Sequence, residues 1–152
     1  MAENYHESMA RWLESRDWTA FFTVTFRNPV RYPRQAVNRV ARFIPMMDSQ
    51  ARAFVAAEPH SKGDYHVHGL LSTPVPDVGY FEGVWSVLFE RFGRSRVESV
   101  VRPGAVANYC AKYVTKRTSD WDLVGVEAGN WDPEWDQYAR DVAVYNGLTG
   151  RI

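Results

Sequence analysis

The sequence predicts an α+β fold in which helices pack on a central antiparallel sheet. Segments rich in aromatic and β-branched residues, typical of β-strands, are separated by segments whose apolar residues recur every three or four positions, as in helices. The two central strand-like segments are joined by a short turn, so we expect them to pair as an antiparallel hairpin. The length of 152 residues and the hydrophobic content of 45% fit one domain with a single core.

The N-terminal third of the chain reads as helix, strand and helix. Residues 3–16 are predicted to form an amphipathic helix, because their apolar side chains lie three and four positions apart. Residues 18–26 are aromatic and β-branched and are predicted to form a strand. Helical spacing returns over residues 34–47, where Pro45 leaves the end of the helix open.

The central hairpin is predicted from turn residues between two β-type segments. Residues 52–58 form the first strand, Tyr65–Ser72 the second, and Ser61–Asp64 supplies a lysine, a glycine and an aspartate for the turn. Pairing of these strands places Glu58 near His66.

Two further helices and a strand are predicted beyond the hairpin. Residues 81–92 form a helix with Gly93 as its stop signal, and residues 96–101 form a fourth strand. Helices are also expected over residues 105–117 and 133–145.

The charges are unevenly distributed although the formal net charge is zero. Residues 1–118 carry 16 Lys and Arg against 11 Asp and Glu, a balance of +5, whereas residues 119–152 carry 2 against 7, a balance of −5. We expect residues 1–118 to form the core, and residues 119–152 to form an acidic, tryptophan-rich extension packed on the same domain. A basic core is compatible with a phosphate-binding face, although it is equally typical of a solvated surface.

Cysteine usage and hydropathy predict a soluble, cytoplasmic protein with no membrane partner. Cys110 is the one cysteine, so no internal disulfide forms. No apolar run reaches the roughly 18 residues that a membrane-spanning helix needs, and the charged N-terminus lacks the pattern of a secretory signal.

Two histidines on the second strand of the hairpin form a candidate metal site. His66 and His68 are two positions apart, so both point to the same face of the strand. Burying neighbouring imidazoles is costly unless each finds a hydrogen-bond partner or both share an ion. With Glu58 as a third ligand, they would hold a divalent cation that keeps open positions for water or a phosphate oxygen. His60 and Asp64 are competing ligands, but their place at the turn favours interpreting them as solvated residues.

The predicted helix over residues 105–117 carries two tyrosines and two lysines on one stripe. Tyr109, Lys112, Tyr113 and Lys116 follow the spacing i, i+3, i+4 and i+7, and the opposite arc is apolar. A tyrosine is a poor nucleophile unless a neighbouring cation or metal stabilises its phenolate, and the lysines can do so. The alternative is that the tyrosines cover the sheet and the lysines are solvated.

Three segments in this order resemble motifs 1, 2 and 3 of the HUH endonucleases that initiate rolling-circle replication: Phe22–Phe26 (FTVTF), His66–His68 (HVH) and Tyr109–Tyr113 (YCAKY). The resemblance covers about residues 18–117. The second tyrosine, four residues after the first, is similar to the two-tyrosine phage initiators.

This resemblance implies a sheet of about five antiparallel strands, like an RNA-recognition-motif core, and an enzyme that nicks and rejoins single-stranded DNA at an origin. His66, His68 and Glu58 would hold Mg²⁺ or Mn²⁺ against the scissile phosphate. Tyr109 would form a 5′-phosphotyrosyl link, with Lys112 and Lys116 neutralising charge. Tyr113 would act in a second transfer or serve in positioning or packing.

Several alternatives remain open from the sequence. An HUH transposase or relaxase uses the same chemistry. A noncatalytic single-stranded DNA-binding module would stack bases on exposed aromatics, and Phe22 and Phe26 could serve as such a platform, although their pattern favours packing in the core. A metal-dependent hydrolase would use water in place of tyrosine. The sequence contains no P-loop motif of the form GxxxxGK[ST], so we expect a host or viral helicase, together with a polymerase, as partners.

Overall fold

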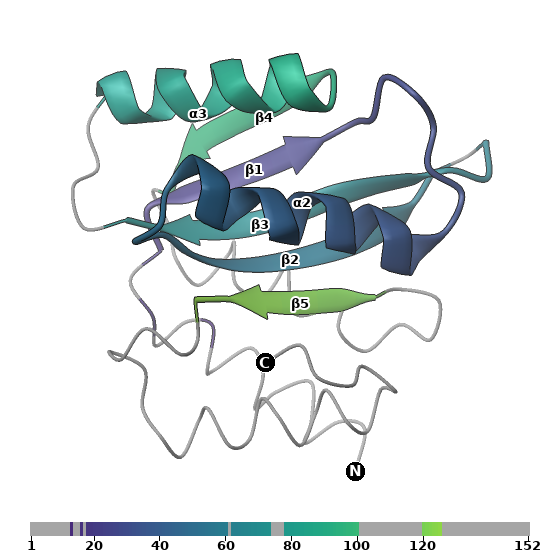
Figure 1. Ribbon diagram of the computed structural model, residues 1–152, viewed down its shortest axis with the longest axis horizontal. Coiled ribbons are helices and arrows are strands. Elements are labelled where there is room, and N and C mark those ends of the chain that lie inside the picture. Colours follow the sequence, from purple (N-terminus) through teal and green to yellow (C-terminus); the bar gives the residue numbers. More distant parts are fainter. Residues whose placement is uncertain are drawn as a thin grey trace, which may run out of the picture.

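A computed structural model of the chain describes residues 13, 16, 18–60, 62–73, 78–100 and 120–125. Within these residues it contains five strands and two helices, shown in Figure 1. In chain order they are β1 (Ala20–Val24), α2 (Pro33–Met47), β2 (Arg52–Pro59), β3 (Tyr65–Ser72), α3 (Val78–Arg91), β4 (Ser95–Ser99) and β5 (Trp121–Val124). The predicted α+β fold is therefore confirmed.

The five strands form one antiparallel sheet with the order β4-β1-β3-β2-β5. The hairpin of β2 and β3 lies at its centre, because β1 and β4 extend the sheet on the β3 side and β5 extends it on the β2 side. Glu58 pairs with His66 in the register of this hairpin, as the sequence predicts. The family resemblance implies about five strands, and the sheet has five within the described residues.

Most predicted elements within the described residues form within a few positions of their expected bounds. Strand β1 is shorter than predicted, and α3 begins three residues earlier. Helix α2 continues through Pro45 to Met47 and ends at Asp48, whose backbone N–H still donates to the carbonyl of Ile44. The helices predicted over residues 3–16, 105–117 and 133–145 lie outside the described residues, apart from Leu13 and Arg16.

Strand β5 is not predicted by the sequence pattern. It has only four residues, and a charged residue, Asp122, interrupts its apolar character. Asp122 is nevertheless 3% exposed, and its Oδ1 accepts a hydrogen bond from the backbone N–H of Leu123. The strand exists because β2 offers it a backbone ladder, which is a tertiary contact that a local pattern does not report.

Both helices pack on the same face of the sheet, which we call the helical face (Figure 1). Helix α2 contacts β2, β3 and β5, and α3 contacts β4 and β1. Alternate strand residues and the inner sides of both helices form the core on this face: Ala20, Phe22, Val24, Val37, Val40, Ile44, Val55, Val67, Leu71, Val84 and Leu88. Phe22 and Phe26 are both buried there, so neither is exposed for stacking on bases.

The other face of the sheet, which we call the second face, carries the intervening strand residues. At the end of the hairpin away from the turn it is apolar, because Phe54 and Leu70 are fully buried opposite each other and Phe54 lies 6.0 Å from the ring of Trp121. Toward the turn the same rows change to Glu58, His66 and His68. Strand alternation thus brings the polar candidates to one end of the second face.

Candidate metal centre

The turn end of the hairpin brings five potential metal ligands onto the second face. Glu58 and His66 are cross-strand partners, and His68 follows His66 by two positions. His60 and Asp64 extend the same two rows beyond the strands. The backbone N–H of His60 donates to the carbonyl of Asp64 over 2.8 Å, so the hairpin pairing continues to the turn.

His60, Asp64 and His66 form a cluster in which one ligand atom from each residue lies within 4.8 Å of the others. His60 Nδ1 is 3.1 Å from Asp64 Oδ1, and the rings of His60 and His66 stack with centroids 4.2 Å apart. Such a His-Asp-His group fits a divalent cation. The turn position suggests that His60 and Asp64 are solvated, but the structure brings them to His66. The sequence signal that could have identified them is their position: His60 follows Glu58 by two residues, and Asp64 precedes His66 by two.

The electrostatics of His66 favour the form that binds metals. Burial, together with the neighbouring His60, holds the pKa of His66 below its ordinary value, so the ring is neutral at pH 7. Its Nε2 is shielded from solvent and has no hydrogen-bond partner among the described residues. A buried nitrogen without a partner is costly. A coordinated cation removes that cost, so the residues present fit a metal ion.

Asp64 complements this neutral ring with a negative charge. Desolvation works to raise the pKa of its carboxyl, but a backbone hydrogen bond and the contact with His60 outweigh it and hold the pKa below the ordinary value. The carboxylate is therefore ionised at neutral pH and available as an oxygen ligand.

His68 lies deeper in the sheet and has partners at both ring nitrogens. Its Nε2 contacts Glu58 Oε2, and its Nδ1 is 3.1 Å from the hydroxyl oxygen of Thr23 on β1. The ring also stacks on Phe21, and the residue is 7% exposed. If Nδ1 donates its proton to Thr23, Nε2 keeps the lone pair that a metal requires. The predicted ligands Glu58 and His68 thus contact each other directly beside His66.

The tyrosine and lysine stripe lies outside the described residues. This applies to Tyr109, Lys112, Tyr113 and Lys116, whose roles remain predictions from the sequence. The described part of the site therefore consists of imidazoles and carboxylates, a mixed nitrogen and oxygen set that can hold a divalent cation.

Comparison with known proteins identifies the family to which the chain belongs. The sequence model of a replication-associated protein family, the ORF2 family, matches residues 19–118, which is more than half of the chain. The match spans β1, the hairpin with all five candidate ligands, both helices and β4. No curated protein and no solved structure matches the chain. Among the described residues, neither helix is long and apolar enough to cross a membrane.

Proposed function

Because this chain belongs to the ORF2 family of replication-associated proteins, we propose that it initiates rolling-circle replication by nicking and rejoining single-stranded DNA at an origin. The observation that carries the proposal is the gathering of three histidines and two carboxylates at one end of the second face, around the unpartnered Nε2 of His66. A divalent cation held by such a group can polarise a scissile phosphate, which would let a replication protein cut DNA as well as bind it.

The ligand set that we propose is centred on His66. His68 and Glu58 complete it from the strands, as the sequence predicts, and His60 with Asp64 supplies a competing pair from the turn. Mg²⁺ or Mn²⁺ bound there supplies Lewis-acid polarisation of the scissile phosphate. Thr23 holds the ring of His68 in place through Nδ1.

The nucleophile in this proposal is Tyr109. Its phenolate oxygen attacks the phosphorus in line, an O–P bond forms, and the bond from phosphorus to the 3′ oxygen breaks. The 3′ oxygen takes a proton and becomes the hydroxyl that a polymerase extends, while the 5′ phosphate stays on the tyrosine. Attack by a 3′ hydroxyl reverses the step and rejoins the strand. Lys112 and Lys116 offset the charge of the phenolate and phosphate, and Tyr113 serves either a second transfer or the positioning of the first.

The partners follow from this chemistry. The proposed substrate is the single-stranded DNA of an origin, and a helicase and a polymerase of the host or virus would unwind and copy the strand. The polymerase would use the 3′ hydroxyl that the nick releases.

A covalent adduct assay tests the proposal. Single-stranded oligonucleotides with a randomised central segment, labelled at the 3′ end because the fragment with that end stays on the tyrosine, are incubated with the protein and Mn²⁺, and a labelled protein band is sought after denaturation. We expect a labelled band that chelation prevents and that Tyr109→Phe removes. Tyr32→Phe, a change at an exposed tyrosine outside the site, is the control and retains the band.

Two outcomes contradict the proposal. Cleavage without any labelled band indicates a hydrolase that uses water, and an undiminished band with Tyr109→Phe shows that another residue is the nucleophile. Tyr113→Phe then separates the two roles of the second tyrosine, since a positioning role affects the first cleavage, whereas a second-transfer role affects strand exchange and spares it.

A further inference from the structure

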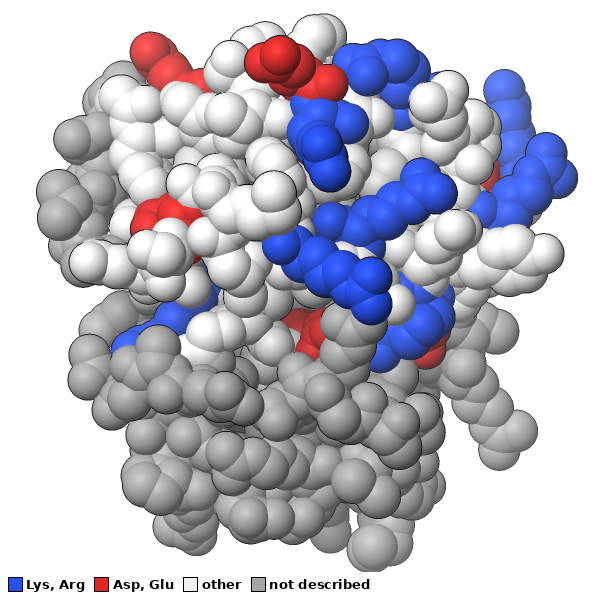
Figure 2. Space-filling model, viewed as in Figure 1, with Lys and Arg blue, Asp and Glu red and all other residues white. Residues whose placement is uncertain are grey.

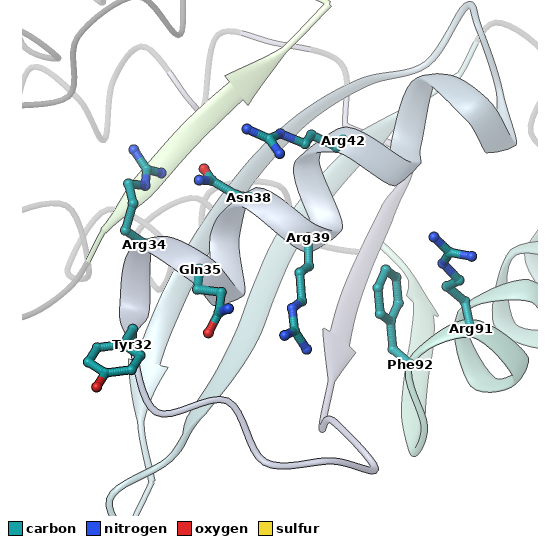
Figure 3. Close-up of a pocket in the computed structure, with 8 residues that line it drawn as sticks. All are labelled: Tyr32, Arg34, Gln35, Asn38, Arg39, Arg42, Arg91 and Phe92. Atoms are coloured by element: carbon teal, nitrogen blue, oxygen red, sulfur yellow. The ribbon is translucent and has the colours of Figure 1, made fainter.

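A groove lies along the outer side of α2, on the helical face and therefore across the sheet from the candidate metal centre. Its volume is about 840 Å³. We call it the arginine groove, because four of its eight lining residues are arginines (Figure 3). The lining residues are Tyr32, Arg34, Gln35, Asn38, Arg39, Arg42, Arg91 and Phe92.

The arginine groove is strongly positive. None of its lining residues is acidic, and Arg39, Arg42 and Arg91 are exposed. Figure 2 shows Lys and Arg side chains gathered over α2. Arg39 and Arg42 form no ion pair with a carboxylate in the part of the chain that the structure describes. Their charges are therefore available to an anionic partner.

Two other arginines frame these exposed charges. Arg34 donates to the backbone carbonyl of Trp121 over 3.2 Å and lies 3.9 Å from the carboxylate of Asp120, so its guanidinium is fixed beside β5 and part of its charge is offset. Arg91, at the end of α3, lies over the ring of Phe43 with 5.5 Å from Cζ to the centroid. Figure 3 shows Arg39 extending from α2 on the side where Arg91 lies. The positive charge thus reaches from α2 toward the end of α3.

The spacing of the groove residues suits a phosphate backbone. Gln35, Asn38, Arg39 and Arg42 lie at i, i+3, i+4 and i+7 of α2, a span of about 10 Å along the helix axis. One DNA strand places a phosphate about every 3.4 Å of duplex axis, so the span matches about three phosphates. Arginine and amide N–H groups are the donors that commonly contact these oxygens.

The aromatic content favours duplex over single-stranded DNA. Binding of single strands relies on several exposed rings that stack on bases. In the arginine groove Tyr32 is 70% exposed, but Phe92 is 9% exposed, so one ring is available. A duplex keeps its bases stacked internally and presents only its phosphates to such a surface.

We propose that the arginine groove binds the phosphate backbone of duplex DNA, as a contact separate from the site of strand cleavage. The proposal rests on the proposed function in that it takes DNA as the partner. Because the groove and the metal centre lie on opposite faces of the sheet, the groove would hold duplex flanking the nicked strand and would not touch the scissile phosphate.

The test measures binding of a labelled duplex of arbitrary sequence across a range of salt concentrations. The double variant Arg39→Gln/Arg42→Gln should weaken binding at least tenfold at low salt. It should also lower the slope of log K against log salt by about 2, since each lost phosphate contact removes about 0.9. Arg39→Gln and Arg42→Gln are also measured singly, and Arg94→Gln, which removes one exposed arginine outside the groove, is their matched control and should have a smaller effect than either.

The proposal is wrong if the double variant keeps the duplex affinity and the salt slope of the wild type. It is also wrong if Arg94→Gln weakens duplex binding as much as the groove variants do. If the double variant loses affinity for single-stranded DNA but keeps its affinity for the duplex, the proposal is also wrong. Thermal unfolding of these variants confirms that they remain folded. Adduct formation on short single-stranded oligonucleotides is measured in parallel and should be unchanged in the double variant, because it reports the metal and tyrosine site. If the wild type forms no adduct, the proposed function is wrong, but the duplex measurement still tests whether the groove binds DNA.

Discussion

Mn²⁺ is expected to stabilise this protein against heat, and His66 is expected to be required for the effect. An ion that binds only the folded chain, at 100 times its Kd, adds about 2.7 kcal/mol to the free energy of unfolding. Each kcal/mol raises the Tm of a domain of this size by about 2–4 °C, so the expected rise is about 5–10 °C. His66→Ala should abolish the rise, because it removes the unpartnered Nε2 at the centre of the ligand group.

The assay follows thermal unfolding by circular dichroism after chelation and again during Mn²⁺ titration at about pH 7.5, where the lowered pKa of His66 leaves its ring neutral. Without metal, His66→Ala should have nearly the wild-type Tm, since burial of a nitrogen without a partner contributes no stability. His60→Ala tests the pair of His60 and Asp64 as metal ligands, and His68→Ala tests the pair of His68 and Glu58. If Mn²⁺ leaves the wild-type Tm unchanged, or raises it equally in His66→Ala, the argument for this metal centre fails.

The pH dependence of the metal-free protein provides a second check on the same ring. Burial holds the pKa of His66 below 6.5, its value in an unfolded chain, so the unfolded state binds the proton more readily. Stability should therefore fall as the pH drops through 6.5 toward the lower pKa of the folded state. His66→Ala should flatten that part of the stability profile. If the stability profile of His66→Ala is as steep as that of the wild type, other groups cause the pH dependence.

Three further predictions concern residues around the site and the core. Thr23→Val should weaken Mn²⁺ binding about 10–100-fold by releasing the ring of His68, as measured by calorimetry, whereas Thr23→Ser should retain it; equal affinities would exclude this positioning role. Gly69→Ala should destabilise the fold by about 3 kcal/mol in chemical denaturation, because the new Cβ would lie 2.3 Å from Cζ of the buried Phe22; a loss under about 0.5 kcal/mol would contradict this packing. Burial raises the pKa of Tyr80 to about 12 from 10.0, so stability should fall as the pH rises from 10 to 12 and Tyr80→Phe should reduce that fall; an identical alkaline profile would refute the assignment.

The local pattern of the sequence predicts most of the described fold because each element has its own signal. The turn between residues 61 and 64 sets the hairpin register, and that register together with strand alternation places Glu58, His66 and His68 on one face. Helices α2 and α3 follow from apolar spacing in the same way. These features depend on residues close together in the chain, so the sequence reports them.

The metal site is only partly predictable for the same reason. Its two histidines, and the glutamate across the hairpin, come from a pattern within about ten residues. The contact of Thr23 with His68 joins β1 to β3, and the stacking of His60 on His66 depends on how the turn closes. The first contact has no local signature, because it depends on which strand lies beside β3. The second is signalled only by the two-residue offset of His60 and Asp64 along the rows of the hairpin.

The sequence by itself determined the α+β class, the hairpin register and the pair of histidines on one face, since periodicity and turn chemistry are properties of neighbouring residues. The tertiary structure decided the rest of the described molecule. It placed β5 at the sheet edge, brought His60 and Asp64 to His66, and set the arginine groove across the sheet from them. Strand β5 and the groove depend on packing between segments distant in the chain, which no local pattern encodes, whereas the contact of His60 and Asp64 with His66 depends on how the hairpin turn closes.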